Sequence, residues 1–172
     1  GTVHDYEGSV AVDGAGNSYL AGYFQGSVTV GGTTLTSAGN YDVMLVKYDS
    51  NGNVLWARGE GSPLSEYGRT VTVDGLGGVY LGGDFSGTMS FGGKSVTSLS
   101  TNQDAFVAKY DANGSVVWAK RAGTTSSDYI YSLAADNYGG VYAAGRAGTS
   151  GSQWPGGPSL SSSGGFVMQL QG

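Results

Sequence analysis

Three acid–tyrosine pairs are the side chains in this sequence whose types and spacing could do chemistry. They recur at shifts of 61 and 62 residues, as Asp5-Tyr6, Glu66-Tyr67 and Asp128-Tyr129. A carboxylate accepts hydrogen bonds from hydroxyl groups and a tyrosine ring offers an apolar face, so the pairs suit a sugar or a cation. In the alternative interpretation, each tyrosine packs between repeats and the acid caps a backbone N–H. Repetition favours this architectural alternative, because catalysis usually needs one asymmetric site.

An enzyme would be expected to carry a nucleophile with its base, or a metal-ligand cluster, that occurs once in the chain. The sequence offers no such set: it has no cysteine, and its single histidine, His4, lies outside the repeats. Asp-x-Asn-Gly segments resemble a fragment of a calcium loop, but the side-chain oxygens stop at Asn51 and Asn113, short of the five or more ligands required. We therefore expect no enzymatic activity, no cofactor and no metal site. A glycan-processing enzyme that uses one acid pair is the weaker alternative.

A repeated hairpin organises the rest of the chain. DVMLVKYDSNGNVLWAR (42–58) recurs as DAFVAKYDANGSVVWAK (104–120), with apolar and β-branched residues in both arms and Asp, Asn and Gly between them. These central residues favour a tight reversal. Trp56 and Trp118 occupy matching positions in the second arm, and we expect both to be largely buried. Asp42 and Asp104 open equivalent strands and are expected to bind backbone amides.

A second hairpin precedes each of these segments. Short strands flank the turns at Asp13-Gly14-Ala15-Gly16 and Asp74-Gly75-Leu76-Gly77, and a third copy has Asp136-Asn137-Tyr138-Gly139. No helix follows these glycine-rich turns, which excludes a dinucleotide-binding site. Two miniature hairpins are predicted around Gly31-Gly32 and Gly92-Gly93.

Four strands per unit, repeated about every 60 residues, predict an all-β fold of β-propeller type with four-stranded antiparallel blades. A β-solenoid is the alternative. We expect one domain over residues 1–172, with repeats at about 1–58, 59–120 and 121–172. The third repeat lacks a copy of the fourth strand. In a propeller the tight turns should lie on one face and the longer connections on the other, where ligands usually bind.

The pattern VDxxGxVYLxG, FxGxxxFGG and DAFVAKYDxNGxVxWAK resembles the bacterial β-propeller repeat often labelled SBBP. The resemblance covers nearly the whole chain but is weaker in the third repeat, where Gly164, Gln169 and Leu170 replace Asp, Lys and Tyr. It implies a propeller fold and an extracellular or cell-surface location. It implies no catalytic motif.

Composition limits the partners. The net charge of −5 repels a phosphate backbone, so nucleic acid is not an expected partner. No apolar run approaches the ~20 residues that a membrane-spanning helix needs. The sequence shows no signal peptide, so a secreted protein would have its leader outside this sequence.

The third strand of the last repeat is the expected assembly edge, because a long unpaired edge is a template for another chain. This edge comprises Phe166, Val167, Met168, Gln169 and Leu170. We expect further repeats, or head-to-tail association of identical chains into a ring or filament, to cover it. The functional hypotheses are thus a structural, self-assembling scaffold and, alternatively, a carbohydrate-binding or adhesion module that uses the acid–tyrosine pairs.

Overall fold

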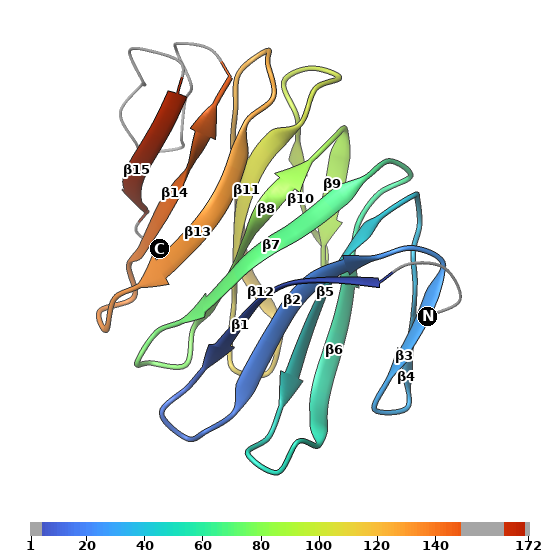
Figure 1. Cartoon of the computed structure of the whole chain (residues 1–172), viewed down its shortest axis with the longest axis vertical. Coiled ribbons are helices and arrows are strands. Elements are labelled where there is room, and N and C mark those ends of the chain that lie inside the picture. The colour runs from blue at the N-terminus through green and yellow to red at the C-terminus, as the bar shows by residue number, and fades with distance from the viewer. Residues whose placement is uncertain (1–4, 149–163, 171–172) are drawn as a thin grey trace.

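The computed structural model describes residues 5–148 and 164–170, excluding the side chains of Asp5 and Glu7. All the secondary-structure elements in this part of the chain are β-strands, which confirms the all-β prediction. Two four-stranded sheets and one three-stranded sheet form the body, and each is antiparallel throughout. Figure 1 shows these sheets side by side, with a small hairpin beside each of the first two.

The first sheet has the order β1-β2-β5-β6, and its strands are β1 (Asp5–Val12), β2 (Ser18–Phe24), β5 (Asp42–Tyr48) and β6 (Val54–Glu60). The second has the equivalent order and consists of β7 (Glu66–Val73), β8 (Val79–Phe85), β11 (Asp104–Tyr110) and β12 (Val116–Ala122). The third contains β13 (Tyr129–Ala135), β14 (Val141–Ala147) and β15 (Gly164–Leu170). The strand order therefore follows the chain in every sheet, as in propeller blades.

The predicted miniature hairpins are also present. One pairs β3 (Ser27–Val30) with β4 (Thr33–Thr36), and the other pairs β9 (Thr88–Phe91) with β10 (Lys94–Thr97). Gly31 and Gly32 between β3 and β4 have φ values of 56° and 81°. Side chains other than glycine rarely adopt this left-handed conformation, which is why the Gly-Gly signal located the turn correctly.

The first strands of the three blades are neighbours, because β7 contacts both β1 and β13. The tight turns of the blades lie along the lower edge of Figure 1, and the connections from one blade to the next lie along its upper edge. We call these the turn end and the loop end. Asp5 and Glu66 are the first residues of β1 and β7, and Asp128 directly precedes β13, so the acid–tyrosine pairs lie at the loop end, where the first strands begin.

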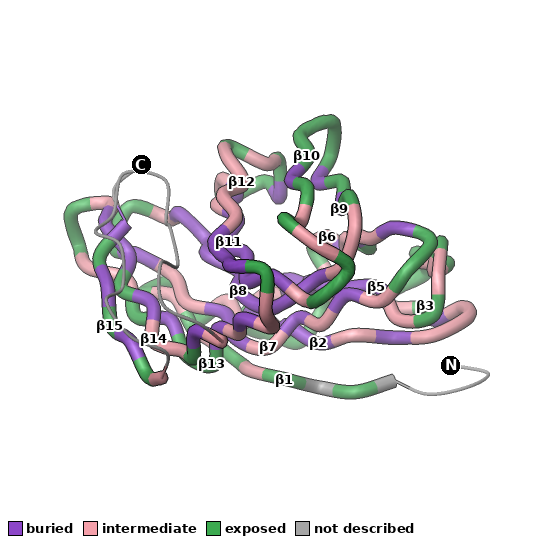
Figure 2. The backbone as a smooth tube through the Cα atoms, turned by 90° about the horizontal axis from the view of Figure 1, so that it is seen from above, coloured by how far each residue is buried: buried purple, intermediate pink, exposed green. Residues whose placement is uncertain are grey.

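Two hydrophobic clusters hold the blades together. One joins the first and second sheets and includes Leu45, Leu81 and Phe106, all fully buried. The other joins the second and third sheets and includes Val107, Ile130 and Val141. Figure 2 shows the buried residues concentrated in the middle strands, whereas most of β1 is intermediate or exposed. Face-to-face burial of neighbouring sheets thus produces a β-propeller-like repeat fold, and no closed barrel is formed by the described residues.

Within the described ranges, no helix is long and apolar enough to cross a membrane.

Candidate functional site

The acids of the acid–tyrosine pairs bind the loops that precede them. Glu66 is fully buried and accepts hydrogen bonds from the N–H of Ser62 at 2.9 Å and from its hydroxyl at 2.5 Å. Asp128 is buried and accepts from the N–H of Thr124 at 2.7 Å and from its hydroxyl at 3.0 Å. Both acids therefore cap backbone N–H groups, as the architectural alternative predicted. The side chain of Asp5 lies outside the described part of the structure.

Burial also changes the pKa of Glu66. It raises the pKa of Glu66 from 4.5 to about 7, although the hydrogen bonds from Ser62 oppose the shift. The protonated form of this side chain is thus favoured by its environment.

The tyrosines of the pairs belong to a row of rings along the loop end that has two parts. Tyr6 stacks on Tyr23 with ring centroids 4.9 Å apart, and Tyr23 meets Tyr67 edge to face at 5.0 Å. Tyr41, just before β5, contacts all three of these rings. Tyr129 and Tyr131 stack on each other at 6.0 Å in the third blade. One part of the row therefore joins the first and second blades, and the other lies in the third blade.

Arg69 joins the two parts of this row. Its guanidinium carbon lies 5.3 Å from the ring centroid of Tyr67 and 5.8 Å from that of Tyr129. The guanidinium is also hydrogen-bonded and ion-paired to Asp84 on the neighbouring strand β8. The Asp84 side chain is fully buried, whereas that of Arg69 is 32% exposed. One charged pair with aromatic rings on both sides thus lies between the second and third blades.

The position of Arg69 is set by a β-bulge that occurs in every blade. The strand register shifts between Glu7 and Ser9, between Gly68 and Thr70, and between Ile130 and Ser132. The residues at these shifts are Gly8, Arg69 and Tyr131. All three line one pocket of about 220 Å³, together with Tyr23 and Gly68. A bulge re-aims the extra residue, and here it directs three different residues of equivalent position toward one place.

The electrostatics of this pocket follow from partial burial. Burial raises the pKa of Tyr23, and the nearby charge of Arg69 offsets part of that effect. Burial also raises the pKa of Asp84, although the hydrogen bond from Arg69 opposes it. For Arg69 burial lowers the pKa, but the hydrogen bond and charge of Asp84 outweigh burial and the net pKa is raised. The pocket therefore presents an aromatic wall and a guanidinium that is held in place and remains protonated. We call the set Tyr6, Tyr23, Tyr41, Tyr67, Arg69, Asp84, Tyr129 and Tyr131 the tyrosine–arginine cluster.

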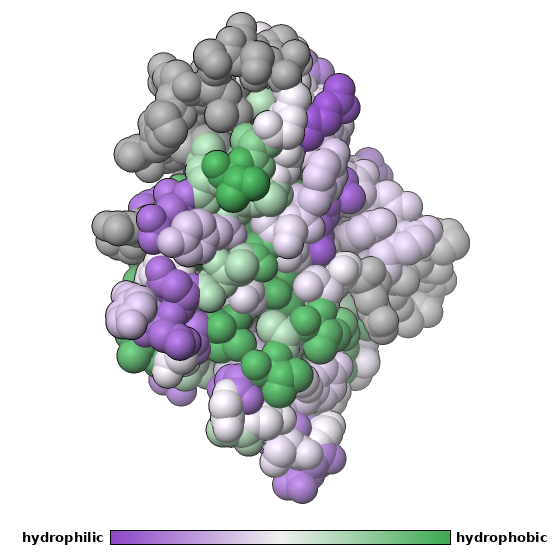
Figure 3. All heavy atoms as spheres, turned by 60° about the vertical axis from the view of Figure 1, so that its left-hand side comes forward, coloured by the Kyte–Doolittle hydropathy of each residue, from purple (hydrophilic) through white to green (hydrophobic). Residues whose placement is uncertain are grey.

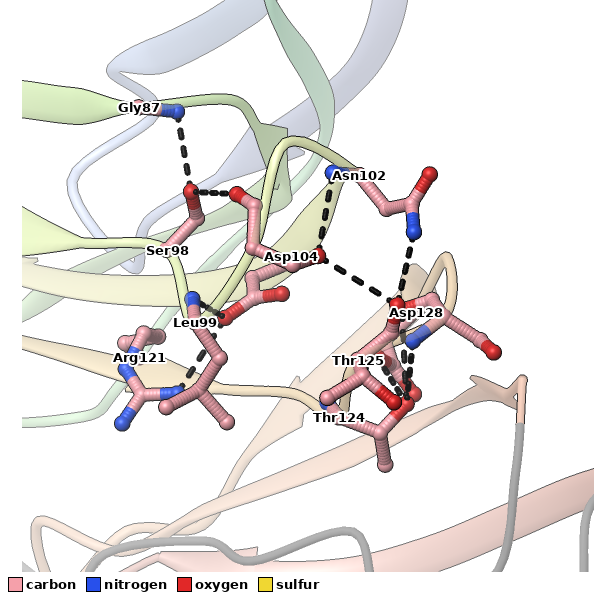
Figure 4. Close-up of polar contacts among 11 residues, drawn as sticks. Gly87, Ser98, Leu99, Asn102, Asp104, Arg121, Thr124, Thr125 and Asp128 are labelled. Atoms are coloured by element: carbon pink, nitrogen blue, oxygen red, sulfur yellow. Dashed lines mark hydrogen bonds and ion pairs between the residues drawn. The ribbon is translucent and has the colours of Figure 1, made fainter.

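The other predicted aspartates also serve the loops. Asp42 accepts hydrogen bonds from the N–H groups of Ala38 at 3.0 Å and Gly39 at 3.3 Å. Figure 4 shows the equivalent Asp104, which accepts from the Leu99 N–H at 3.0 Å and from the Arg121 guanidinium at 3.1 Å. The expectation that Asp42 and Asp104 bind backbone amides is confirmed. Figure 4 also shows Asn102, before β11, donating to the carbonyl of Thr125, before β13, at 2.6 Å, so the loop end is cross-linked between the second and third blades.

The predicted assembly strand, β15, is an edge of the three-stranded sheet. Its side chains alternate: Phe166, Met168 and Leu170 are buried in the second hydrophobic cluster, whereas Val167 is 75% exposed and Gln169 is also exposed. Figure 3 shows the left-hand side of Figure 1, where hydrophobic side chains lie in separate patches among hydrophilic ones.

The tryptophans differ from expectation. Trp56 and Trp118 are only partly buried, because each indole lies on the outermost strand and packs against the tyrosine of its own blade, Tyr19 or Tyr80. The fourth strand of a blade is covered on one side only. The prediction that both tryptophans are largely buried is therefore wrong.

Sequence reasoning missed Arg69, Asp84, Tyr23 and Tyr41. A signal for Arg69 was present, since a glycine, an arginine and a tyrosine occupy the equivalent position two residues after the acid–tyrosine pairs: Gly8, Arg69 and Tyr131. The bulge that directs these residues together has no sequence signature of its own. In the part of the chain that the structure describes, no group of three or more His, Cys, Asp or Glu side chains could hold a metal ion.

The fold and the repeated turns define a β-propeller-like repeat protein. No protein-family model matches the chain. The chain is similar to a regulatory protein, FlaEY, of Caulobacter vibrioides, with 35% identity over 135 residues that cover 77% of this chain and 14% of that protein. It is also similar to an uncharacterised WD repeat-containing protein, L264, of Acanthamoeba polyphaga mimivirus, with 28% identity over 149 residues that cover 75% of this chain and 10% of the relative. The chain thus spans only a small part of the length of either relative.

Proposed function

We propose that this protein is a non-enzymatic β-propeller repeat module that serves as an interaction scaffold. The observation that carries the proposal is the tyrosine–arginine cluster, in which equivalent bulges of three blades bring unlike residues to one pocket. Tyrosine and arginine are the residue types enriched where partners bind most strongly. The similarity to a protein named for its WD repeats is consistent with this role.

The scaffold role includes completion of the blades by further repeats or by other copies of the chain. The exposed edge of β15 supports this part of the proposal, because an unpaired strand edge is a template for pairing. Sedimentation velocity at increasing protein concentration tests self-association. A Val167→Lys variant should lose it, since a charge on an edge strand opposes pairing. Val117→Lys on β12 is the matched control and should associate like the parent. A monomer at all concentrations would contradict self-association.

Carbohydrate binding is the second candidate function, and the row of tyrosine rings beside Arg69 favours it. Rings stack on the apolar faces of sugars, and Arg69 and Tyr131 could donate hydrogen bonds to hydroxyl groups from the rim of the pocket. A glycan array probed with the parent protein, with Tyr131→Ala and with Tyr138→Ala tests this function. Tyr131 is 55% exposed in the cluster, whereas Tyr138 is 92% exposed at the turn end and serves as the control. Binding that Tyr131→Ala abolishes and Tyr138→Ala retains would support it; an array without binding would exclude the tested sugars.

The location of this scaffold is part of the proposal. The resemblance to SBBP repeats favours an extracellular or cell-surface protein, and fractionation of cells that express the full gene product tests it.

A further inference from the structure

The guanidinium of Arg69 has N–H groups that the protein itself does not use. An arginine side chain carries five N–H donors. Asp84 accepts from Nε and, at 3.2 Å, from Nη2. Among the described residues no acceptor binds the other three, which are two on Nη1 and one on Nη2. Arg69 lines the pocket of about 220 Å³ on β7, which contacts the first strands of the blades on both sides. These donors are therefore available to a ligand in the pocket.

The neighbours of Arg69 restrict how a ligand can meet these donors. The rings of Tyr67 and Tyr129 flank the guanidinium carbon, and Asp84 takes the edge that carries Nε. The other edge has one N–H on Nη1 and one on Nη2 that run parallel, which matches the two oxygens of a carboxylate. Because Asp84 already holds the guanidinium in place, a ligand does not have to order it. The site is thus preorganised for an acid group.

The described carboxylates on the strands around this site are already engaged. Both oxygens of Glu66 accept hydrogen bonds from Ser62, and both oxygens of Asp128 accept from backbone N–H groups. Asp84 is fully buried, and both of its oxygens bind Arg69. The net charge of −5 opposes an anion at a distance, so specific hydrogen bonds must hold an anion that binds.

The other walls of the pocket suit the ring of a sugar. Tyr131 is more than half exposed, and one face of its ring stacks on Tyr129. Tyr23 forms a second aromatic wall. At the equivalent bulge of the first blade only backbone lines the pocket, because a Cβ at Gly8 would lie 2.6 Å from the carbonyl oxygen of Gly68. The pocket is smaller than the roughly 300–1,000 Å³ of sites for drug-sized ligands, and a single sugar ring is a ligand of suitable size.

We propose that this pocket binds a sugar that carries a carboxylate, such as a uronic acid. The carboxylate accepts hydrogen bonds from Nη1 and Nη2 of Arg69, and the apolar face of the sugar ring lies against Tyr131. An acidic peptide side chain would use the same donors but would leave the exposed ring of Tyr131 without a partner. The inference names the class of sugar for the carbohydrate-binding role proposed above, and it rests on that role.

Three methyl glycosides, added to the intact 172-residue protein, test the proposal. Methyl β-glucuronide carries the carboxylate, its methyl ester has the same ring without the charge, and methyl β-glucoside has a hydroxymethyl group instead. The protein is labelled with ¹⁵N at arginine, and the Nε–H signal of Arg69 is assigned by its loss in Arg69→Lys. The glucuronide should shift this signal with saturation and bind about tenfold or more tightly than the other two, since hydrogen bonds between charged groups are the strong ones. Equal binding of acid and ester, or an unshifted signal, would overturn the proposal.

Matched arginine variants show whether the paired N–H groups are what binds. Arg69→Lys keeps a positive charge beside Asp84 but loses the planar pair of donors, so the glucuronide should bind about tenfold or more weakly. Arg121→Lys is the control, because Arg121 is paired at 3.1 Å with the buried Asp104 and does not line the pocket; it should bind like the parent. Unchanged binding in Arg69→Lys would contradict the assignment. The comparison of acid and ester uses the parent protein, so it decides the question even if Arg69→Lys does not fold.

Other outcomes separate this inference from the carbohydrate-binding role itself. Neutral sugars that bind through Tyr131 as tightly as the glucuronide would support the role and reject the carboxylate. Absence of binding by every sugar would reject both, and would leave the scaffold role to the self-association experiment. A Gly-Glu-Gly peptide with blocked ends that binds as tightly as the glucuronide would overturn the sugar and indicate an acidic peptide as the partner.

Discussion

The carboxylates at the turn end of the blades share one hydrogen-bonding arrangement, whereas those at the loop end do not. At the turn end the same arrangement occurs five times: an aspartate accepts hydrogen bonds from the N–H groups two and four residues later, in the turns of Asp13, Asp49, Asp74, Asp111 and Asp136. At the loop end the arrangement varies: Glu66 and Asp128 each accept from the N–H and the hydroxyl of the residue four positions earlier, whereas Asp84 accepts from the Arg69 guanidinium. Repetition therefore marks the architecture, and the unequal positions mark the candidate site.

The acidity of these groups differs in the same way. At Asp13 burial raises the pKa, but hydrogen bonds from Asn17, Tyr19 and Ala15 outweigh it and the net pKa is lowered. Hydrogen bonds from Asn53 lower the pKa of Asp49. Burial instead raises the pKa of Asp42, Glu66, Asp84 and Asp104. The ionised forms of Asp13 and Asp49 thus stabilise their turns, whereas burial disfavours the ionised forms of these four loop-end acids.

The largest effect on stability is expected at the loop end, where Arg69 is ion-paired to the buried Asp84. Arg69→Met removes the cation and leaves the buried carboxylate of Asp84 unpaired, which should lower the free energy of unfolding by about 3–5 kcal/mol. Urea unfolding followed by tyrosine and tryptophan fluorescence measures the loss. The double variant Arg69→Met/Asp84→Leu should recover much of it, since no charge is then buried. Equal destabilisation in the double variant would show that packing of Arg69, and not its charge, is what matters.

At the turn end, two turns with the same hydrogen bonds should differ in their contribution to stability because their aspartates differ in burial. Asp74→Ala removes a buried carboxylate that accepts from Leu76, Gly78 and Tyr80, and should cost about 3 kcal/mol. Asp111→Ala removes the same turn contacts at a half-buried residue and should cost about 1 kcal/mol. Thermal unfolding of the two variants measures the difference. Equal losses would mean that the turn motif alone sets the contribution.

Stability should fall as the pH rises from about 5 to 8. The folded-state pKa of Glu66, about 7, lies above its usual value of 4.5, so its contribution is complete below pH 4.5 and is lost as the pH rises through 7. We expect a loss of about 1–3 kcal/mol in urea unfolding at pH 8 compared with pH 5. Glu66→Gln should flatten this dependence. Glu60, whose pKa burial also raises to about 7, provides a second, independent variant in Glu60→Gln.

The smallest expected difference compares two glycines in equivalent turns. Gly52→Ala and Gly114→Ala share the strain of a positive φ, about 1 kcal/mol each. Gly114→Ala should cost a further 1–2 kcal/mol or so, because its Cβ would lie 2.9 Å from the Trp56 ring. Chemical denaturation of both variants in parallel measures the excess. In a Trp56→Ala background the two substitutions should become equal.

The sequence by itself determined the repeated parts of this protein. Local signals were sufficient there: Asp, Asn and Gly at the turns, and alternating apolar residues in the arms, act over a few residues and specify hairpins directly. The same reasoning assigned Asp42 and Asp104 to backbone amides and located both miniature hairpins at their Gly-Gly pairs. Regular spacing then sufficed to predict the blades.

Only the tertiary structure decided the contacts of residues that differ between the repeats. Arg69 and Asp84 are 15 residues apart and meet because a bulge shifts the register of β7 beside β8. Tyr67 and Tyr129 flank the same guanidinium because their blades pack face to face. The partial burial of Trp56 and the unsatisfied Nε1 of Trp118 likewise depend on which neighbour covers the outermost strand. Contacts between blades join residues distant in the chain, and no local preference encodes their geometry.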